Sequence, residues 1–440
     1  MTTDFASTAL LTDQYELTMI DAALNAGTAD RDCVFELFAR KLPAGRRYGV
    51  VAGVGRALEA LQRFRFRDSE LEFLRERGIV RDETLSWLAD YRFTGNIRGY
   101  REGELFFPNS PLLEVHAGFA EGVILETLLL SIYNYDSAVA SAASRMVSVA
   151  QGRPLAEMGS RRTGEHSAVA ASRAAYIAGF DATSNLEAGR TWGVPTMGTA
   201  AHSFTLLHDT ERDAFVAQLE TLGVGTTLLV DTYDVGRAIE LAIEVAGPGL
   251  GGVRLDSGDL PTLVAEVRAH LDALGATSTK ITVTNDLDEF AIAGLSSAPV
   301  DSYGVGTSVV TGSGAVASGM VYKLVARRDE ASGEWVSVAK ASTGKVSIGG
   351  VKHPVRRRDE RGVATAELVG IGDASVGDGD DRELAVDLVT DGVVDERWLG
   401  AAGVAAAREH CAAVIAELPL TALRLRAGDP ALSTVFVDGD

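Results

Sequence analysis

Apolar runs that end in small polar residues recur through the middle of the chain, from about residue 110 to residue 325. The clearest are TTLLVDTYD (226–234), GVRLDSGDL (252–260), KITVTNDLD (280–288) and VDSYGVGTSVV (300–310), and helical periodicity follows the first three. One unit takes roughly 20 to 28 residues, the length of a strand and a helix. The runs are rich in β-branched residues, as strands buried on both faces require. This pattern predicts a closed or nearly closed α/β barrel.

Less regular runs supply further strand candidates for the same barrel. They are GVILETLLL (122–130), EMGSRR (157–162), GFDATSN (179–185) and VPTMGTAAHS (194–203).

The two ends of the chain have a different pattern. QYELTMIDAALNAG (14–27) is amphipathic and ends on glycine, which predicts a helix, and CVFELFARKLP (33–43) alternates like a strand. After about residue 325 the segments are typical of antiparallel strands, and GVAAAREHCAAVIAEL (403–418) predicts a helix. We expect these ends to form a second domain. The predicted divisions are residues 1–110 and 326–440 for the α+β domain and 111–325 for the α/β barrel.

Composition narrows the class of partner. The chain has 440 residues, of which 46% are hydrophobic, enough to bury a large core. Its formal net charge of −20 argues against a nucleic-acid or anionic-membrane partner, because both need a basic surface. A small anionic substrate stays possible, since a local basic pocket can exist on an acidic protein.

The cysteines and the N-terminus bear on location. Cys33 and Cys411 are the only cysteines and lie far apart, which argues against a disulfide framework or a structural zinc site. The N-terminal segment lacks a basic region followed by an apolar one, and no apolar run reaches the ~20 residues of a membrane span. We expect a cytoplasmic protein.

Polar residues at the predicted strand ends carry the candidate chemistry, because barrel enzymes place catalytic groups there. In RLDSGDL, Arg254 and Asp256 point to the same face of a strand, and Gly258 permits close backbone approach. This set suits a ligand with phosphate and hydroxyl groups. A structural ion pair, with Asp259 capping the next helix, is the alternative.

Three further strand ends point to anion or cation binding. Gly306 and Thr307 could form a phosphate nest, or a plain turn. The pair Arg161 and Arg162 suits carboxylate or phosphate, but could also be an exposed pair at a helix start. In TNDLDE (284–289), the side chains of Asn285, Asp286 and Asp288 could hold Mg²⁺ through water or cap a helix.

His202 stands in GTAAHSFTLLHDT (198–210) between small residues and Ser203. It has no partner at metal-ligand spacing, and His208 completes no zinc pattern. A core histidine is the ordinary alternative. A position at the barrel mouth favours chemistry, because imidazole titrates near neutrality and is a nucleophile when neutral.

Several of these motifs occur together in the order seen in one enzyme family. LLTDQYELTM, FELFARKLPAGRRYGVVAGV, GSRR, GTAAHSF, VDTYD, GVRLDSGDL and YGVGTSVVT resemble the motifs of nicotinate phosphoribosyltransferases over residues 10–325. The resemblance implies an irregular α/β (TIM-like) barrel joined to an α+β domain of N- and C-terminal segments. It also implies a homodimer with the active site at the subunit interface.

The reaction that the resemblance implies joins nicotinate to 5-phosphoribosyl 1-diphosphate and gives nicotinate mononucleotide and diphosphate. ATP hydrolysis is coupled to it, Mg²⁺ is the cofactor, and the product enters NAD salvage. A related enzyme acting on nicotinamide or quinolinate and a non-catalytic barrel that binds phosphoribosyl diphosphate are alternatives. An aldolase would need a Schiff-base lysine at a strand end, and none of these ends carries one.

The resemblance also implies roles for residues. His202, Arg254 and Asp256 are the implied catalytic residues, and His202 is the histidine that ATP phosphorylates. Tyr15 matches an aromatic that stacks on the pyridine from the partner subunit. The other implied substrate contacts are Arg40 and Lys41 near the phosphates, Arg161, Thr183 and Ser184 at the nicotinate, Ser203, Ser257 and Gly258 beside the catalytic residues, and Gly306 and Thr307 at the 5′-phosphate.

Two positions depart from the family pattern. Met158 stands where many relatives have an aromatic that sandwiches the pyridine, although a thioether can also pack on a ring. TND replaces a commoner small-Gly-Asp sequence at residues 284–286.

Overall fold

The computed structural model describes residues 6–43, 45–340, 347–374 and 376–438. The chain has a mixed α/β fold and divides into two compact units, Met1–Ser141 with Ala315–Asp440 (unit 1) and Ala142–Gly314 (unit 2). These boundaries lie away from the predicted ones at 110 and 325. The difference follows from strand pairing. Two strands that begin inside the predicted barrel, β5 (Pro111–Gly118) and β12 (Met320–Arg328), pair with β1 (Asp32–Ala39) in unit 1.

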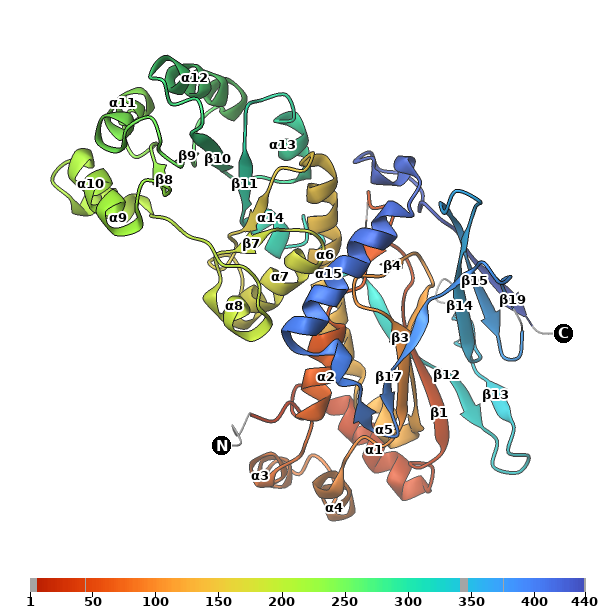
Figure 1. Ribbon diagram of the computed structural model, residues 1–440. Helices are drawn as coiled ribbons and strands as arrows, with labels where there is room; N and C mark the ends of the chain where they lie inside the picture. Colours follow the sequence, from red (N-terminus) through yellow and green to blue (C-terminus); the bar gives the residue numbers. More distant parts are fainter. Residues whose placement is uncertain (1–5, 44, 341–346, 375, 439–440) are drawn as a thin grey trace. The chain divides into compact units, whose positions relative to one another are not determined.

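Unit 2 is built on a parallel sheet of six strands (Figure 1). The order across the sheet is β7 (Ala182–Thr183), β6 (Leu155–Glu157), β11 (Ser302–Val305), β10 (Lys280–Thr284), β9 (Gly252–Leu255) and β8 (Thr227–Leu229). Four of these strands lie in the four clearest apolar runs, so the parallel strand–helix pattern is confirmed. Among the described strands, β7 and β8 end the sheet and do not pair with each other, so the structure does not show a closed barrel.

Helices separate the strands of unit 2 along the chain. They are α7 (Glu165–Ile177), α8 (Leu186–Trp192), α9 (His202–Leu207), α10 (Glu211–Leu222), α11 (Val235–Ala246), α12 (Leu260–Ala273), α13 (Glu289–Gly294) and α14 (Thr307–Val310). Local signals set where several of them begin. Asn185 accepts a hydrogen bond from Ala188 N at the start of α8, and Asp288 accepts two at the start of α13.

Unit 1 contains a seven-stranded sheet made from both ends of the chain. Its order is β13 (Trp335–Ser337), β12, β1, β5, β3 (Asn96–Tyr100), β17 (Ala385–Thr390) and β18 (Val393–Val394). Two smaller sheets have the orders β16 (Arg382–Glu383), β14 (Lys352–Arg358), β15 (Ala364–Ile371), β19 (Thr434–Asp438), and β2 (Gly49–Val50), β4 (Leu105–Phe106). N-terminal strands therefore pair directly with strands from the C-terminal third of the chain.

The helices of unit 1 follow from apolar periodicity. They are α1 (Gln14–Ala26), α2 (Val54–Gln62), α3 (Asp68–Glu76), α4 (Asp82–Asp90), α5 (Phe119–Val123), the helix α6 (Glu126–Val149) that runs through the boundary at residue 141, and α15 (Gly400–Ala416). In α1, Leu17, Ile20 and Ala23 are buried at a spacing of three, and Gly27 ends the helix with a φ of 70°. The predicted helix at 14–27 is thus confirmed.

GVILETLLL is not a barrel strand. Residues 122–130 form the end of α5 and the start of α6, within unit 1. Ile124 and Leu125 are fully buried in the unit 1 core, beside Phe35, which stacks on Tyr322 with ring centroids 5.2 Å apart. A run that is apolar on all sides fits a buried helix as well as a buried strand, which is why periodicity misled here.

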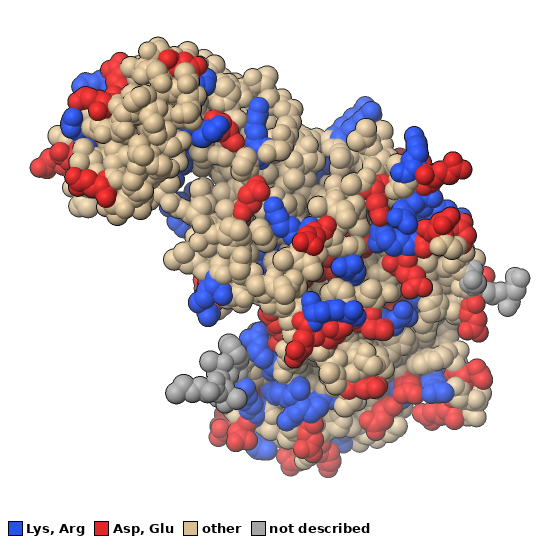
Figure 2. Space-filling model, in the orientation of Figure 1, with Lys and Arg blue, Asp and Glu red and all other residues tan. Residues whose placement is uncertain are grey.

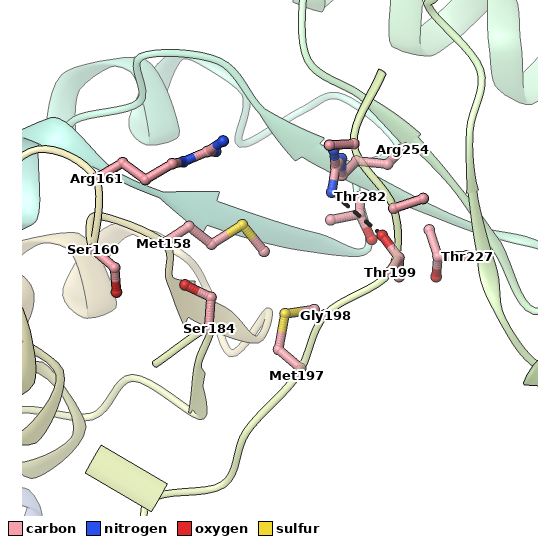
Figure 3. A pocket seen from close by; sticks show the side chains of 12 residues that line it. Met158, Ser160, Arg161, Ser184, Met197, Gly198, Thr199, Thr227, Arg254 and Thr282 are labelled. Carbon is pink, nitrogen blue, oxygen red and sulfur yellow. Dashed lines mark hydrogen bonds between the residues drawn. The ribbon is translucent and has the colours of Figure 1, made fainter. Parts of the chain in front are cut away.

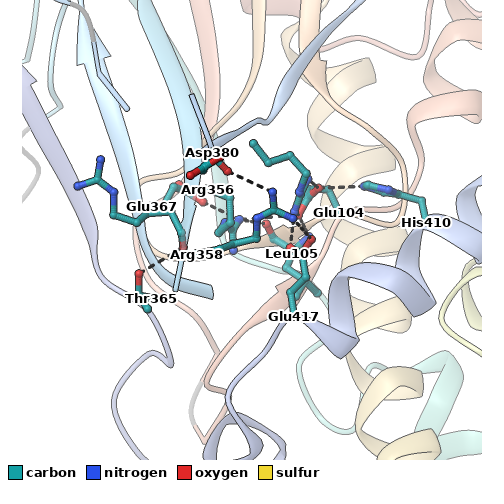
Figure 4. Close-up of polar contacts among 11 residues, drawn as sticks. Glu104, Leu105, Arg356, Arg358, Thr365, Glu367, Asp380, His410 and Glu417 are labelled. Atoms are coloured by element: carbon teal, nitrogen blue, oxygen red, sulfur yellow. Dashed lines mark hydrogen bonds and ion pairs between the residues drawn. The ribbon is translucent and has the colours of Figure 1, made fainter. Parts of the chain in front are cut away.

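Buried charges join distant segments of unit 1 (Figure 4). Glu104, which precedes β4, lies 2.6 Å from Arg382 Nη1 in β16 and 2.9 Å from His410 Nε2 in α15. Arg356 in β14 lies 2.9 Å from the Glu367 carboxylate in β15. These contacts fasten C-terminal elements to the segment around β4.

The outer surface mixes charges of both signs. On the face that Figure 2 shows, Lys and Arg side chains lie interspersed with Asp and Glu, and residues of other types cover much of the surface. Within the described ranges, we find no helix with the length and apolar character needed to cross a membrane.

Candidate active site

A pocket of about 300 Å³ lies in unit 2 against the parallel sheet (Figure 3). Some of its residues follow the carboxyl ends of β6 and β7, and Thr227, Arg254 and Thr282 come from within β8, β9 and β10. Parallel strands bring the residues that follow them to one edge, so segments far apart in sequence meet here. The residues that line it are Met158, Ser160, Arg161, Ser184, Met197, Gly198, Thr199, Ala200, Ala201, Thr227, Arg254 and Thr282.

Two arginines give the pocket its charge. Figure 3 shows Arg161, from the turn after β6, and Arg254, from β9, on two sides of the pocket, with the thioethers of Met158 and Met197 between them. Arg254 Nη1 donates to Thr199 Oγ1 at 3.3 Å, whereas Arg254 Nε is buried and has no hydrogen-bond partner among the described residues. Burial lowers the pKa of Arg254, although Asp256 and Asp231 oppose that shift. The unused donor favours an anionic ligand beside Arg254.

Asp231, which follows β8, organises the turn after β9. Its Oδ2 accepts hydrogen bonds from Asp256 N at 2.8 Å and from Ser257 Oγ at 2.7 Å. The Asp256 carboxylate in turn accepts a hydrogen bond from Thr284 Oγ1 at the end of β10. Gly258 has a φ of 92°, a left-handed backbone conformation that glycine adopts without strain. Asp231 Oδ1 is buried, and no residue in the described part of the chain forms a hydrogen bond with it.

His202 is the first residue of α9 and is not a core residue, because 40% of its side chain is exposed. Its Nδ1 lies 3.1 Å from Thr232 Oγ1. Its Nε2 lies 3.9 Å from Asp231 Oδ1 and 3.9 Å from Asp256 Oδ2. An accessible imidazole beside two carboxylates can act as a base or a nucleophile. Ser203 follows it on the exposed side of α9.

His208 has a structural role. Its Nδ1 lies 2.8 Å from the Phe204 carbonyl oxygen, and its ring packs on Phe204 with centroids 4.8 Å apart.

The predicted nicotinate contacts divide between the pocket and the core. Ser184 lines the pocket, but Thr183 does not, because it is fully buried and its hydroxyl donates to Glu157 at 2.6 Å. The expectation that Thr183 contacts ligand directly is therefore corrected: its side chain points into the protein.

The other predicted strand ends have clear local structures. Gly306 and Thr307 follow β11 at the carboxyl edge of the sheet, between the ends of β6 and β10, and begin α14. Asp288 caps α13, with hydrogen bonds from Phe290 N and Ala291 N at 2.9 and 2.8 Å. Of the two alternatives for Asp288, capping is the one that the structure shows.

Tyr15, Arg40 and Lys41 belong to unit 1. Tyr15 is 45% exposed on α1, and burial of part of its ring together with Glu126 raises the pKa of the phenol to about 12. Its neighbour Glu16 is buried and accepts a 2.9 Å hydrogen bond from Thr127 N, which anchors the segment. Arg40 follows β1 with its guanidinium 6.0 Å from the Phe38 ring, and Lys41 is exposed.

Sequence reasoning missed Met197, Thr199, Asp231 and Glu157 as parts of this site. Asp231 lies in VDTYD, a strand end that was recognised as polar, and a search for carboxylates at strand ends finds it. Met197 and Thr199 precede His202 in a stretch of small residues and carry no such signal.

The fold and the pocket together define a class. A parallel sheet with paired guanidinium groups, hydroxyls and carboxylates at its carboxyl edge is typical of α/β proteins that bind small anionic molecules there.

Comparison with known proteins identifies the family. Residues 10–134 match the profile of the nicotinate phosphoribosyltransferase (NAPRTase) N-terminal domain. The chain is 54% identical over 434 residues to the nicotinate phosphoribosyltransferase pncB1 of Mycobacterium tuberculosis (strain ATCC 25618 / H37Rv), covering 97% of this chain and 94% of that one. It is 38% identical over 361 residues to the nicotinate phosphoribosyltransferase of Bacillus subtilis (strain 168), covering 80% and 73% respectively.

A solved structure extends the likeness to three dimensions. The crystal structure of human nicotinic acid phosphoribosyltransferase matches with a TM-score of 0.82 and 27% identity, covering 97% of both chains. The chain belongs to the nicotinate phosphoribosyltransferase family.

Proposed function

We propose that the protein joins nicotinate to 5-phosphoribosyl 1-diphosphate, releasing nicotinate mononucleotide and diphosphate in NAD salvage. The observation that carries this proposal is the 54% identity to a nicotinate phosphoribosyltransferase along 97% of the chain. The pocket supports it, because it offers a guanidinium on each of two sides and thioethers between them.

The pocket residues can divide the two substrates between them. Arg161 is suited to the nicotinate carboxylate, and Met158 and Met197 to the faces of the pyridine ring. Arg254 is suited to phosphate or diphosphate, and Asp256 to ribose hydroxyls.

The rate of glycosyl transfer depends mainly on how the protein positions the two reactants. The bond from ribose C1 to diphosphate breaks, positive charge develops on the ribose, and the pyridine nitrogen forms the new bond at C1. Holding the reactants in line can supply up to ~7–11 kcal/mol of the barrier. Fixed cations beside the departing diphosphate add electrostatic stabilisation.

The proposed enzyme uses Mg²⁺, and the carboxylate oxygen atoms of Asp231 and Asp256 are suitable ligands for this ion. Asp231 Oδ1 is buried without a hydrogen-bond partner in the described ranges, and the Asp256 carboxylate is 43% exposed. Mg²⁺ is commonly held by one or two carboxylates together with water and substrate phosphates. Asp231 and Asp256 would hold the ion, whose chemistry is to neutralise phosphate charge. Within the described residues no three His, Cys, Asp or Glu side chains form a ready cage, so water and phosphate would complete the shell.

Three finer features complete the proposal. ATP hydrolysis drives the transfer through phosphorylation of His202. The parallel strands of unit 2 form part of an irregular barrel. The enzyme is a homodimer in which Tyr15, Arg40 and Lys41 act across the interface. The support for all three is the family membership and the motifs that contain these residues.

The decisive experiment measures diphosphate release from 5-phosphoribosyl 1-diphosphate with nicotinate, nicotinamide or quinolinate, each with and without ATP. We expect nicotinate to give the highest kcat/KM and ATP to increase it. A higher rate with another pyridine assigns a different substrate. Binding of phosphoribosyl diphosphate with no diphosphate release for any pyridine would show a non-catalytic protein.

Gly304 in β11 sets the space available to Met158. A Cβ at this position would lie 2.7 Å from Met158 Sδ and 2.6 Å from Thr284 Cγ2, closer than side chains tolerate. In Gly304→Ala, we expect the flexible Met158 to move into the pocket and the KM for nicotinate to rise about tenfold or more. Steady-state kinetics with both substrates measures this effect.

Gly294→Ala is the matched control, because a Cβ there meets nothing within 4 Å. An unchanged KM for nicotinate in Gly304→Ala would show that Met158 does not border the pyridine.

A further inference from the structure

We propose that Glu157 is a positioning residue that fixes the two loops presenting Arg161 and Ser184 to the pyridine. The inference rests on the proposed function, because it assigns the pocket to nicotinate. Glu157 is the last residue of β6, between β7 and β11 in the sheet, and does not itself line the pocket.

The Glu157 carboxylate is fully buried and accepts hydrogen bonds from three places. One oxygen accepts from Gly159 N, in the turn that leads to Arg161. The other accepts from Ser172 Oγ at 2.7 Å, in α7, and from Thr183 Oγ1 at 2.6 Å, beside Ser184. One side chain therefore holds both pocket loops and the helix behind them.

Further hydrogen bonds tie the two loops to each other. Ser184 N donates to the Glu157 carbonyl oxygen at 2.9 Å. Asn185 N donates to Thr183 Oγ1 at 3.0 Å, and Asn185 Nδ2 donates to Ser160 Oγ at 3.0 Å. Ser160 and Ser184 both line the pocket, so this network reaches the pocket surface from Glu157 through one hydrogen bond at Ser184 and through three at Ser160.

The turn after Glu157 has no spare space. A Cβ on Gly159 would lie 2.2 Å from Val310 Cγ1, 2.8 Å from the Gly306 carbonyl oxygen and 3.0 Å from Glu157 Oε1. The Gly159 backbone is therefore packed closely against Val310, Gly306 and the Glu157 carboxylate, and Arg161 follows two residues later.

The charge of Glu157 is held by neutral donors. Across the described residues, no Lys, Arg or His side chain forms an ion pair with it, whereas the buried Glu289 of the same unit pairs with Arg145 at 3.0 Å. All three donors point at carboxylate oxygens, so a carboxylate satisfies each of them. A glutamine has one oxygen and one amide group, so its amide would have to donate to the Ser172 and Thr183 hydroxyls. Those hydroxyls would then have to donate elsewhere, to the Ala168 carbonyl oxygen at 2.9 Å from Ser172 Oγ and to Ser172 Oγ at 3.0 Å from Thr183 Oγ1. Glu157→Gln therefore removes the charge and rearranges the hydrogen bonds that join the two loops.

The test compares Glu157→Gln with the wild type. We expect the KM for nicotinate to rise about 10- to 100-fold through misplacement of Arg161 and Ser184. We expect kcat and the KM for phosphoribosyl diphosphate to change less than threefold, about the level of ordinary context dependence. Glu289→Gln is the control for the loss of a buried carboxylate in the same unit. It also breaks the ion pair with Arg145, so it tests whether destabilisation of unit 2 alone raises the KM for nicotinate.

A second readout does not depend on catalysis. Amide hydrogen exchange at residues 159–162 and 184–186 should be faster in Glu157→Gln and unchanged in Glu289→Gln. If the wild type fails to act on nicotinate, the proposed function fails, while hydrogen exchange still tests the role of Glu157. Unchanged exchange in these loops overturns the positioning role, as does an unchanged nicotinate KM in an active wild-type background.

A milder variant guards against a failure to fold. Thr183→Val keeps the side-chain shape and the Glu157 carboxylate, and removes the hydroxyl that donates to Glu157 and accepts from Asn185 N. We expect a smaller rise in the nicotinate KM, and faster exchange near Ser184. A fall in thermal stability with neither effect would show that the network only supports the fold.

Discussion

Replacing His202 by alanine is expected to abolish ATP coupling and leave a slow transfer reaction that ignores ATP. In the proposed cycle, Nε2 of His202 bonds to the γ-phosphorus of ATP, the bond to the bridging oxygen breaks, and ADP leaves. Water later takes the phosphoryl group as inorganic phosphate. Nδ1 lies 3.1 Å from Thr232 Oγ1, which leaves Nε2 on the side of Asp231 and Asp256.

The size of the effect follows from what phosphorylation adds. A phosphoryl group brings close to two negative charges and strong acceptors to a site beside two carboxylates and Arg254. Such a charge change can alter the affinity of the site for its substrate, and couplings of this kind typically change an affinity about 5- to 150-fold. In His202→Ala, we expect ATP to give no increase in the rate of diphosphate release. The rate without ATP should stay within about threefold of the wild-type rate.

The measurement is ADP and diphosphate production in the same reaction. His208→Ala serves as the control, because His208 lies on the same segment but, among the described residues, its side chain hydrogen-bonds only to the Phe204 carbonyl oxygen. ADP production by His202→Ala in step with nicotinate mononucleotide would contradict the role of His202.

Periodicity predicted the strands of unit 2 well because each is short, apolar and followed by its own helix. The four clearest runs became β8, β9, β10 and β11, in sheet order as well as chain order. The same reasoning misassigned residues 122–130, since a helix buried on all sides has the same apolar run as a strand. The unit boundaries depend on which strands pair, as β5 and β12 do with β1, and pairing over more than 70 residues has no local signal.

The candidate site shows the same limit. The sequence pattern led to Arg254 in the strand β9 and Asp256 directly after it, and to His202 because it stands out among small residues; their roles stay predictions. The buried hydroxyl of Thr183 was not predictable, since its partner Glu157 lies 26 residues away in the chain. Asp231 Oδ2 likewise meets Asp256 N across 25 residues. Contacts between strand ends depend on sheet order, which the sequence pattern leaves open.

Glu104 is the residue of unit 1 whose loss should cost the most stability. Burial opposes its charge, but hydrogen bonds from His410 and Arg382 and the charges of Arg356 and Arg382 outweigh burial and hold the pKa of the carboxyl well below its usual range. Removing one member of a buried charge cluster leaves its partners uncompensated, which typically costs about 3–5 kcal/mol. We expect that loss in the free energy of unfolding of Glu104→Gln at pH 7.

The same variant predicts a change in acid sensitivity. The unfolded chain binds a proton at Glu104 near pH ~4.3, and the folded protein resists that proton until a lower pH. The stabilisation is therefore complete above about pH 4.3 and is lost as pH falls toward the folded-state pKa. Denaturant unfolding from pH 7 to pH 3 should give a shallower decline in Glu104→Gln than in the wild type. Asp387→Asn, which breaks the exposed pair with Arg98, should cost at most about 1 kcal/mol. A Glu104→Gln loss as small as that of the control, with an unchanged acid slope, would show that the buried cluster contributes no net stability.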